Sequence, residues 1–273
     1  IAAFSAICRS PLIPLSDSIT MTHVRREEAE YGKVRLWGTI SFIIGSYAGG
    51  GILAYLSDDM ILWGIVLSCV FVVVGFWVLP DTRSEGVAPH FSAGFRLATR
   101  PIFILFVITV ALSMTSHTAV YVFGSLYWRG EGISEATISF FWAFGAASEI
   151  FVFWKGAALL KRFGPVMLIF SGAAAGVLRW YLTGISTEVW VLTIAQALHA
   201  FTFGAAHLGG MTFINRVAPK ELLTTAQTLY SALAMGAAMA LMTPITGRLY
   251  QMLGPEDTFF VMMALAGSSA ILA

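Results

Sequence analysis

The sequence predicts an all-α membrane protein with about nine transmembrane helices. Of its 273 residues, 58% are hydrophobic and only 11% are charged, and the mean hydropathy is +0.80. Soluble domains carry about a quarter charged residues, so charge this sparse cannot cover a soluble surface. The apolar runs are close to the roughly 20 residues that a spanning helix needs, and they do not alternate apolar with polar positions. This pattern favours helices over barrel strands.

Polar residues divide the apolar sequence into nine candidate helices. The last candidate is short, and the chain opens inside an apolar run at Ile1. We therefore interpret the chain as a fragment of a longer membrane protein. The candidate helices are 1–22, 34–56, 60–80, 101–127, 136–159, 166–185, 188–214, 223–250 and 257–273.

The basic residues predict the orientation in the membrane. Twelve of the sixteen Lys and Arg residues fall in the alternate loops 23–35, 81–100, 155–165 and 215–222. Loops on the cytoplasmic side carry an excess of Lys and Arg. We therefore expect a multi-pass protein of the inner (plasma) membrane whose 81–100 loop is cytoplasmic.

The longest loop, 81–100, is rich in Pro and Gly and reads as a cytoplasmic linker between two helical bundles. On this reading residues 1–80 are the last three helices of an N-terminal bundle. Residues 101–273 form a C-terminal six-helix bundle whose last helix is truncated. Three helices followed by six suggest a six-plus-six transporter that lacks its first three helices.

The sequence contains, in this order, the stretch 10–17, the block Tyr31-Gly-Lys-Val-Arg-Leu-Trp-Gly38, His117, Tyr127-Trp128, Glu149, Arg179-Trp180, His199, His207 and the run 226–232. Together these elements resemble one known family, the phenylpropionic acid transporter family of the major facilitator superfamily. The resemblance covers the chain from the family's fourth helix into its twelfth. It implies the major facilitator fold and a proton-coupled symporter, related to the sugar and nucleoside symporters of the same branch.

Ionisable residues inside a bilayer usually face a bundle interior or a wet cavity, so they are the first candidates for function. His117 shares one helical stripe with Tyr121, and we expect both to line a cavity. The alternative is that His117 hydrogen-bonds a neighbouring helix.

A second stripe lies in the segment 188–214, where Gln196, His199, Phe203 and His207 fall within an arc of about 80° on an α-helix. The two histidines would be about 12 Å apart along the axis, too far to ligate one metal ion. The stripe therefore suits a substrate path, with Phe203 as an aromatic face between two histidines that can bind an anion when charged. The family resemblance places these helices on the central cavity.

Three further residues are open to two interpretations each. Glu149 is our first candidate for a coupling proton site, because a buried carboxyl can hold a proton; the alternative is a structural ion pair with Arg179. Arg179 keeps its charge everywhere, and the resemblance places it on a peripheral helix, which favours a structural partner over substrate contact. Asp17 is a candidate for a helix cap or a gate with Lys33 or Arg35, and less so for a proton carrier.

Together these residues predict proton-coupled import of a small aromatic carboxylate; phenylpropionate is what the resemblance implies. The three histidines would attract the carboxylate, Tyr121 and Phe203 would stack on its ring, and Glu149 would cycle the proton. A sugar or nucleoside substrate on the same fold remains open, as does a transport-incompetent fragment that acts as an interaction module.

Other chemistries are not legible in the sequence. There is no Walker A, His-Glu-x-x-His or Gly-x-Ser-x-Gly pattern, so we expect no enzyme. We expect no cofactor, no metal and no nucleic-acid partner at a net charge of +1. The expected partners are a small-molecule substrate, protons and the lipid bilayer, and the expected state is a monomer.

Overall fold

The computed structural model describes residues 12–53, 60–78 and 91–273, and every regular element in these ranges is a helix. Five stretches are long and apolar enough to cross a membrane: Pro101–Gly130, Glu135–Trp154, Gly156–Ile185, Val189–Val217 and Lys220–Leu253. The main elements are α2 (Leu12–Arg25), α3 (Tyr31–Leu53), α4 (Met60–Val78), α5 (Phe91–Ala98), α6 (Pro101–Thr115), α7 (Thr118–Gly130), α8 (Glu135–Trp154), α9 (Gly156–Ile185), α10 (Val189–Ala197), α11 (Ala206–Val217), α12 (Leu223–Tyr230), α13 (Ala238–Leu253) and α14 (Pro255–Leu272).

The candidate helix 101–127 is interrupted where α6 meets α7. The Oγ of Ser116 and the Nδ1 of His117 both bond the carbonyl of Ser113, at 2.6 and 3.0 Å, and the Oγ1 of Thr118 bonds the carbonyl of Thr115 at 2.7 Å. Side chains that bond back to preceding carbonyls compete with the helical ladder and bend it. The break therefore follows from three consecutive polar residues.

Two predicted loops contain helix instead. Residues 156–163 form the first turns of α9, which bends at Gly164, where φ is +76° directly before Pro165. Glycine adopts this conformation without the steric cost that other residues meet. The predicted linker 81–100 includes the helix α5, and its residues 81–90 lie outside the described ranges.

Two of the long helices contain π-helical segments, which the sequence did not indicate. One is Ala200–Ala205, labelled η1, between α10 and α11; the other is Ser231–Ala237, labelled η3, between α12 and α13. A π-segment widens the turn and rotates the residues that follow, and such segments are frequent at functional sites. The helical arc that joins His199 to His207 on an ideal α-helix is altered by η1.

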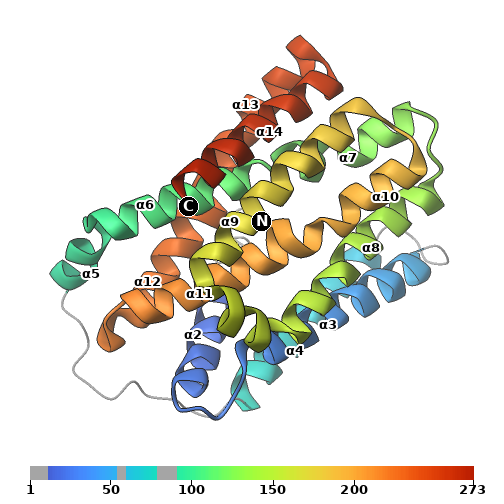
Figure 1. Cartoon of the computed structure of the whole chain (residues 1–273). Helices are drawn as coiled ribbons and strands as arrows, with labels where there is room; N and C mark the ends of the chain where they lie inside the picture. Colours follow the sequence, from blue (N-terminus) through green and yellow to red (C-terminus); the bar gives the residue numbers. More distant parts are fainter. Residues whose placement is uncertain (1–11, 54–59, 79–90) are drawn as a thin grey trace.

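Helix α9 crosses the middle of the view in Figure 1. It packs along α14 on one side and along η1 and α11 on another, while α3 packs along α8 and α2 along α12. Large apolar side chains stay exposed on the outer surface, among them Trp77 and Leu241. In a membrane protein such side chains face lipid.

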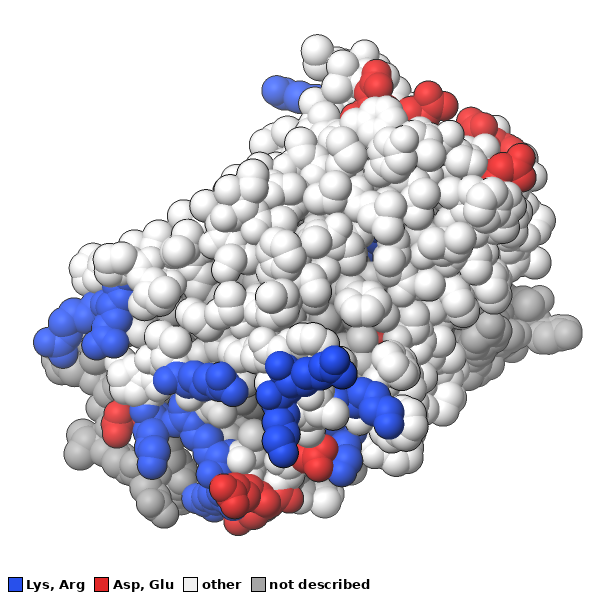
Figure 2. Space-filling model, in the orientation of Figure 1, with Lys and Arg blue, Asp and Glu red and all other residues white. Residues whose placement is uncertain are grey.

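The charged residues separate toward the two ends of the helices. Figure 2 shows Lys and Arg gathered at one end, where the α2–α3 and α8–α9 connections lie, and a group of Asp and Glu at the opposite end. The surface between these ends is almost free of charge in this view. This division is the one that a bilayer imposes on a spanning bundle.

A cavity with two arginines and one carboxyl group

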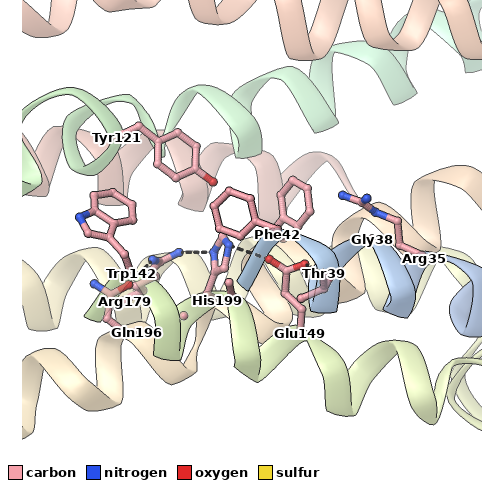
Figure 3. A pocket seen from close by; sticks show the side chains of 13 residues that line it. Arg35, Gly38, Thr39, Phe42, Tyr121, Trp142, Glu149, Arg179, Gln196 and His199 are labelled. Carbon is pink, nitrogen blue, oxygen red and sulfur yellow. Dashed lines mark hydrogen bonds and ion pairs between the residues drawn. The ribbon is translucent and has the colours of Figure 1, made fainter. Parts of the chain in front are cut away.

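A cavity of about 600 Å³ lies between α3 and the helices α7 to α10. Its polar lining includes Arg35 and Thr39 of α3, Glu149 of α8 and Arg179 of α9 (Figure 3). Its aromatic lining is Phe42, Tyr121, Trp142 and Phe203. Helices that are far apart in the sequence thus supply one site, which is typical of binding cavities between the helices of a bundle.

A chain of hydrogen bonds joins Glu149 to Arg179 through His199. The Oε1 of Glu149 lies 3.0 Å from the Nε2 of His199, and the Nδ1 of His199 lies 2.9 Å from an amino nitrogen of Arg179. A guanidinium can only donate, so Nδ1 accepts and the ring proton sits on Nε2, facing the carboxyl group. His199 is therefore a neutral bridge, and the direct Glu149–Arg179 pair considered from the sequence is replaced by an indirect one.

The other oxygen of Glu149 has a partner that can reverse its role. The hydroxyl of Thr39 lies 3.4 Å from Oε2. A hydroxyl both donates and accepts. Thr39 can donate to a carboxylate, or accept from a protonated Oε2, while Oε1 keeps its bond from His199. Glu149 can thus exchange one proton without losing its neighbours.

Arg179 is almost fully buried, with 1% of its surface exposed, yet it reaches the cavity wall. It donates to Gln196 at 3.0 Å and to Thr202 at 2.9 Å, besides His199, and its guanidinium carbon lies 4.7 Å from the ring centroid of Trp180. These three bonds, all from the two amino nitrogens, hold the guanidinium in place, while its Nε is buried without a partner. The α9 helix is therefore not peripheral to this site.

His117 does not line the cavity but stands behind it. Its Nδ1 donates to the carbonyl of Ser113, so its Nε2 accepts from Thr202, 3.1 Å away. Thr202 in turn accepts from Arg179. His117 is thus a neutral anchor for the network, which is the interhelical hydrogen bond considered as the alternative.

Arg35 differs from Arg179 because it has no hydrogen bond or ion pair among the described residues. Its Nε is buried without a partner, as is the Nε of Arg179, and its guanidinium carbon lies 5.9 and 6.0 Å from the ring centroids of Phe153 and Phe203. Figure 3 shows it on the side of the cavity away from Tyr121 and Trp142. Arg35 was counted with a cytoplasmic loop, although the candidate helix 34–56 already contains Arg35, Thr39 and Phe42, whose spacing of four and three residues puts them on one helical stripe.

Phe203 stands between two histidines, but its faces are already occupied. Its ring centroid lies 5.5 Å from that of His199 and 5.5 Å from that of His207, with interplanar angles of 21° and 3°. It therefore offers the cavity an edge more than a free face. His207 lies outside the cavity, where it contacts Tyr31, and Asp17 bonds Tyr31 rather than Lys33. Lys33 pairs with Glu30.

Tyr121 and Trp142 also belong to the aromatic lining, and a hydrogen bond to Ser125 holds Trp142 in place. Tyr121, with 43% of its surface exposed, lies 6.2 Å from Trp142 between ring centroids. The indole nitrogen of Trp142 donates to Ser125 at 2.9 Å. Gln196 lines the same side and receives its bond from Arg179.

Similarity to known proteins identifies the family. The model of the MFS_1 like family matches residues 1–261. The chain belongs to this family. Among MFS_1-like relatives, a protein of Escherichia coli (strain K12) named "Probable 3-phenylpropionic acid transporter" is 32% identical over 262 residues, a match that covers 94% of this chain and 68% of that protein. The maltose permease of Geobacillus stearothermophilus is 26% identical over 270 residues, covering 97% of this chain and 68% of the permease.

A solved structure shares the fold of this MFS_1-like chain. The crystal structure of nucleoside transporter NupG superimposes with a TM-score of 0.70 at 17% identity, covering 92% of this chain and 70% of that one. The fold and the relatives are those of major facilitator transporters, which are not enzymes. The chain is thus a multi-pass membrane protein of a transporter family.

Proposed function

We propose that this chain carries a small aromatic carboxylate across the membrane together with a proton. The observation that supports this most is the charge of the cavity. Arg35 and Arg179 face one carboxyl group, Glu149, and His199 is neutral. The described charged lining therefore sums to one positive charge when Glu149 is ionised, and one carboxylate on a substrate would balance it.

The shape of the lining supports an aromatic ring on that carboxylate. Tyr121 and Trp142 form an aromatic wall on the side of the cavity away from Arg35 (Figure 3). An arylalkanoate could set its ring against this wall and its carboxylate at the Arg35 guanidinium, which binds carboxylates in a planar, two-pronged way. Cavities of 300–1,000 Å³ commonly hold molecules of this size, and this one is about 600 Å³.

Glu149 would couple the proton to the substrate through charge. When Glu149 takes a proton, the cavity gains one positive charge and attracts an anion more strongly. The bound anion in turn favours protonation by the same free energy, because coupling between two ligands is reciprocal. Thr39 and His199 would hold Glu149 in place in both states.

A neutral sugar or nucleoside is the second candidate, and the maltose permease relative favours it. Gln196, Thr39 and the Tyr121 hydroxyl could bind substrate hydroxyls. The two candidates differ in the charge that moves. One proton with one carboxylate is electroneutral, whereas one proton with a neutral sugar carries a charge and responds to membrane potential.

The orientation and organisation extend this proposal. The Lys- and Arg-rich end would face the cytoplasm of a cell with an inner (plasma) membrane, following the usual bias of basic residues. Residues 1–80 and 101–273 would belong to two bundles joined by the 81–100 segment, and the cavity would lie between them. The carrier would act as a monomer.

The proposal is tested by uptake into proteoliposomes with labelled phenylpropionate. An imposed proton gradient should drive accumulation, and a potassium diffusion potential alone should not. Replacement of Arg35 by Gln should raise the KM about 10- to 100-fold, since a hydrogen bond to a charged group contributes about 1.5–3 kcal/mol. Arg129→Gln is the matched control, because Arg129 pairs with Glu135 on the surface. An unchanged KM in Arg35→Gln would remove Arg35 as the carboxylate anchor.

A further inference from the structure

A second polar cluster is buried outside the cavity, and the proposed transport does not use it. It consists of Asp17, Tyr31, His207 and Tyr230, which we name the Tyr31 cluster. The Tyr31 hydroxyl donates to Oδ1 of Asp17 at 3.0 Å and lies 2.7 Å from Nε2 of His207. The Tyr230 hydroxyl is 3.5 Å from Nδ1 of His207.

The hydrogen-bond roles in the cluster fit together. Tyr31 has one proton, which it gives to Asp17, so its oxygen accepts from the Nε2–H of His207. The Nδ1 of His207 is then free to accept from Tyr230. The Tyr31 hydroxyl can therefore donate to Asp17 and accept from His207 at the same time.

The cluster joins segments from opposite ends of the chain. Asp17 and Tyr31 come from α2 and α3, whereas His207 and Tyr230 come from α11 and α12. The same two parts meet again nearby, because Arg25 at the end of α2 donates to the side chain of Asn215 and, at 2.9 Å, to its carbonyl. A third close approach follows at Gly32, where a Cβ would lie 2.3 Å from the carbonyl oxygen of Phe153.

The position of the cluster places it between the cavity and the Lys- and Arg-rich end. Tyr31 is the first residue of α3, one turn before Arg35, which lines the cavity. His207 follows Phe203 by four residues and stacks on it. The neighbouring ends of α2 and α11 carry basic residues, Arg25 and Arg216. A molecule passing from the cavity to this end must therefore part α2 and α3 from α11 and α12.

We propose that the Tyr31 hydroxyl is the central element of a latch that closes the cavity toward the Lys- and Arg-rich end. Its bond to His207 exists only while the two parts of the chain are together, and its bond to Asp17 fixes the hydroxyl within the α2–α3 part. Opening this end breaks the bond to His207, because Tyr31 lies on α3 and His207 lies on α11. The latch stabilises the closed state relative to the open one and leaves the substrate site itself unchanged.

The test is a distance measurement across this end in lipid nanodiscs, by double electron–electron resonance. Spin labels at Arg26→Cys, on the α2–α3 connection, and Lys220→Cys, between α11 and α12, would report the separation in a background with Cys8→Ser and Cys69→Ser. Tyr31→Phe keeps the ring and removes the hydroxyl. It should raise the ratio of the long-distance to the short-distance population about two- to tenfold, the effect of losing one neutral hydrogen bond, that between Tyr31 and His207.

A second variant removes the other side of the same contact. His207→Phe keeps a ring against Phe203 but has no nitrogen for Tyr31, so it should shift the population in the same direction. Together the two variants should shift it less than the sum of the single effects, because they delete one shared bond. Tyr127→Phe, which removes a buried hydroxyl outside the cluster, should leave the distances as in the parent protein.

The latch is refuted if Tyr31→Phe and His207→Phe both give the parent distance distribution, or if their effects add fully. It is also refuted if Tyr127→Phe opens this end as much as they do. The distances are measured without substrate. The latch can therefore be refuted while transport of an aromatic carboxylate is confirmed, and transport can be refuted while the latch is confirmed.

Discussion

Replacing Glu149 by glutamine is expected to separate transport from proton coupling. Glutamine has the same length, so its carbonyl oxygen can still accept from His199 and its amide can donate to the Thr39 hydroxyl. The variant loses only the negative charge and the exchangeable proton. The neutral amide leaves the cavity with the extra positive charge that protonation of Glu149 would give, so the affinity for the anion should rise, by about 5- to 150-fold for a coupling free energy of about 1–3 kcal/mol.

The assay compares two modes of transport in the same proteoliposomes. With one proton per substrate, an internal pH one unit above the external pH should give about tenfold accumulation in the parent protein, since one pH unit corresponds to about 1.36 kcal/mol. Glu149→Gln should reach only the external concentration. Counterflow exchange, which needs no net proton movement, should continue in the variant.

Glu131→Gln is the matched control, because Glu131 is exposed at the end of α7 and should keep full accumulation. Tenfold accumulation in Glu149→Gln would show that the proton is carried elsewhere. Loss of counterflow as well, in a variant that is folded and inserted, would show that Glu149 serves substrate binding or structure and would refute the coupling role.

Three further changes probe the supports of the site. Thr202→Val removes the hydroxyl that links Arg179 to His117 and should lower the free energy of unfolding by about 1–3 kcal/mol, seen as a lower thermal midpoint in detergent; an unchanged midpoint would contradict the network. Gly164→Ala places a Cβ at a φ of +76° and should cost about 1–2 kcal/mol in the same assay, whereas no loss would mean that the bend relaxes. Ser125→Ala frees the indole of Trp142 and should raise the KM up to about fivefold with kcat unchanged; a fall in kcat alone would refute this positioning role.

The pattern of apolar runs was enough to predict the class of fold. Hydrophobicity and charge are local properties, and the bilayer enforces them on each segment separately. This is why most of the apolar segments overlap a described helix, although α9 begins ten residues before its predicted segment and residues 1–11 lie outside the described ranges, and why Lys and Arg gather at one end. A prediction from these local properties fails at the π-segment η1 and at the α6–α7 break, because hydrogen bonds decide the backbone path there.

The candidate site was only partly accessible from the sequence. An ionisable residue in an apolar run signals a polar environment, so Glu149, Arg179 and His199 could be selected from their chemistry alone. Their order, with His199 between the other two, depends on where three helices meet. Arg35 was missed as a cavity residue because basic residues near a helix end are ordinarily anchors, and only the packing of α3 against α8 brings it to the cavity.

The sequence by itself thus determined a helical membrane protein and its transporter family, because those follow from composition, spacing and short motifs read in order. The tertiary structure alone decided which polar groups share the cavity and which are withdrawn from it. His199 lines the cavity, whereas His117 and His207 lie outside it and contact Thr202 and Tyr31. In the sequence all three are histidines within apolar segments, so nothing there distinguishes them. The physical reason is that a buried polar group is placed by the partner it finds on another helix, and a sequence does not record that partner.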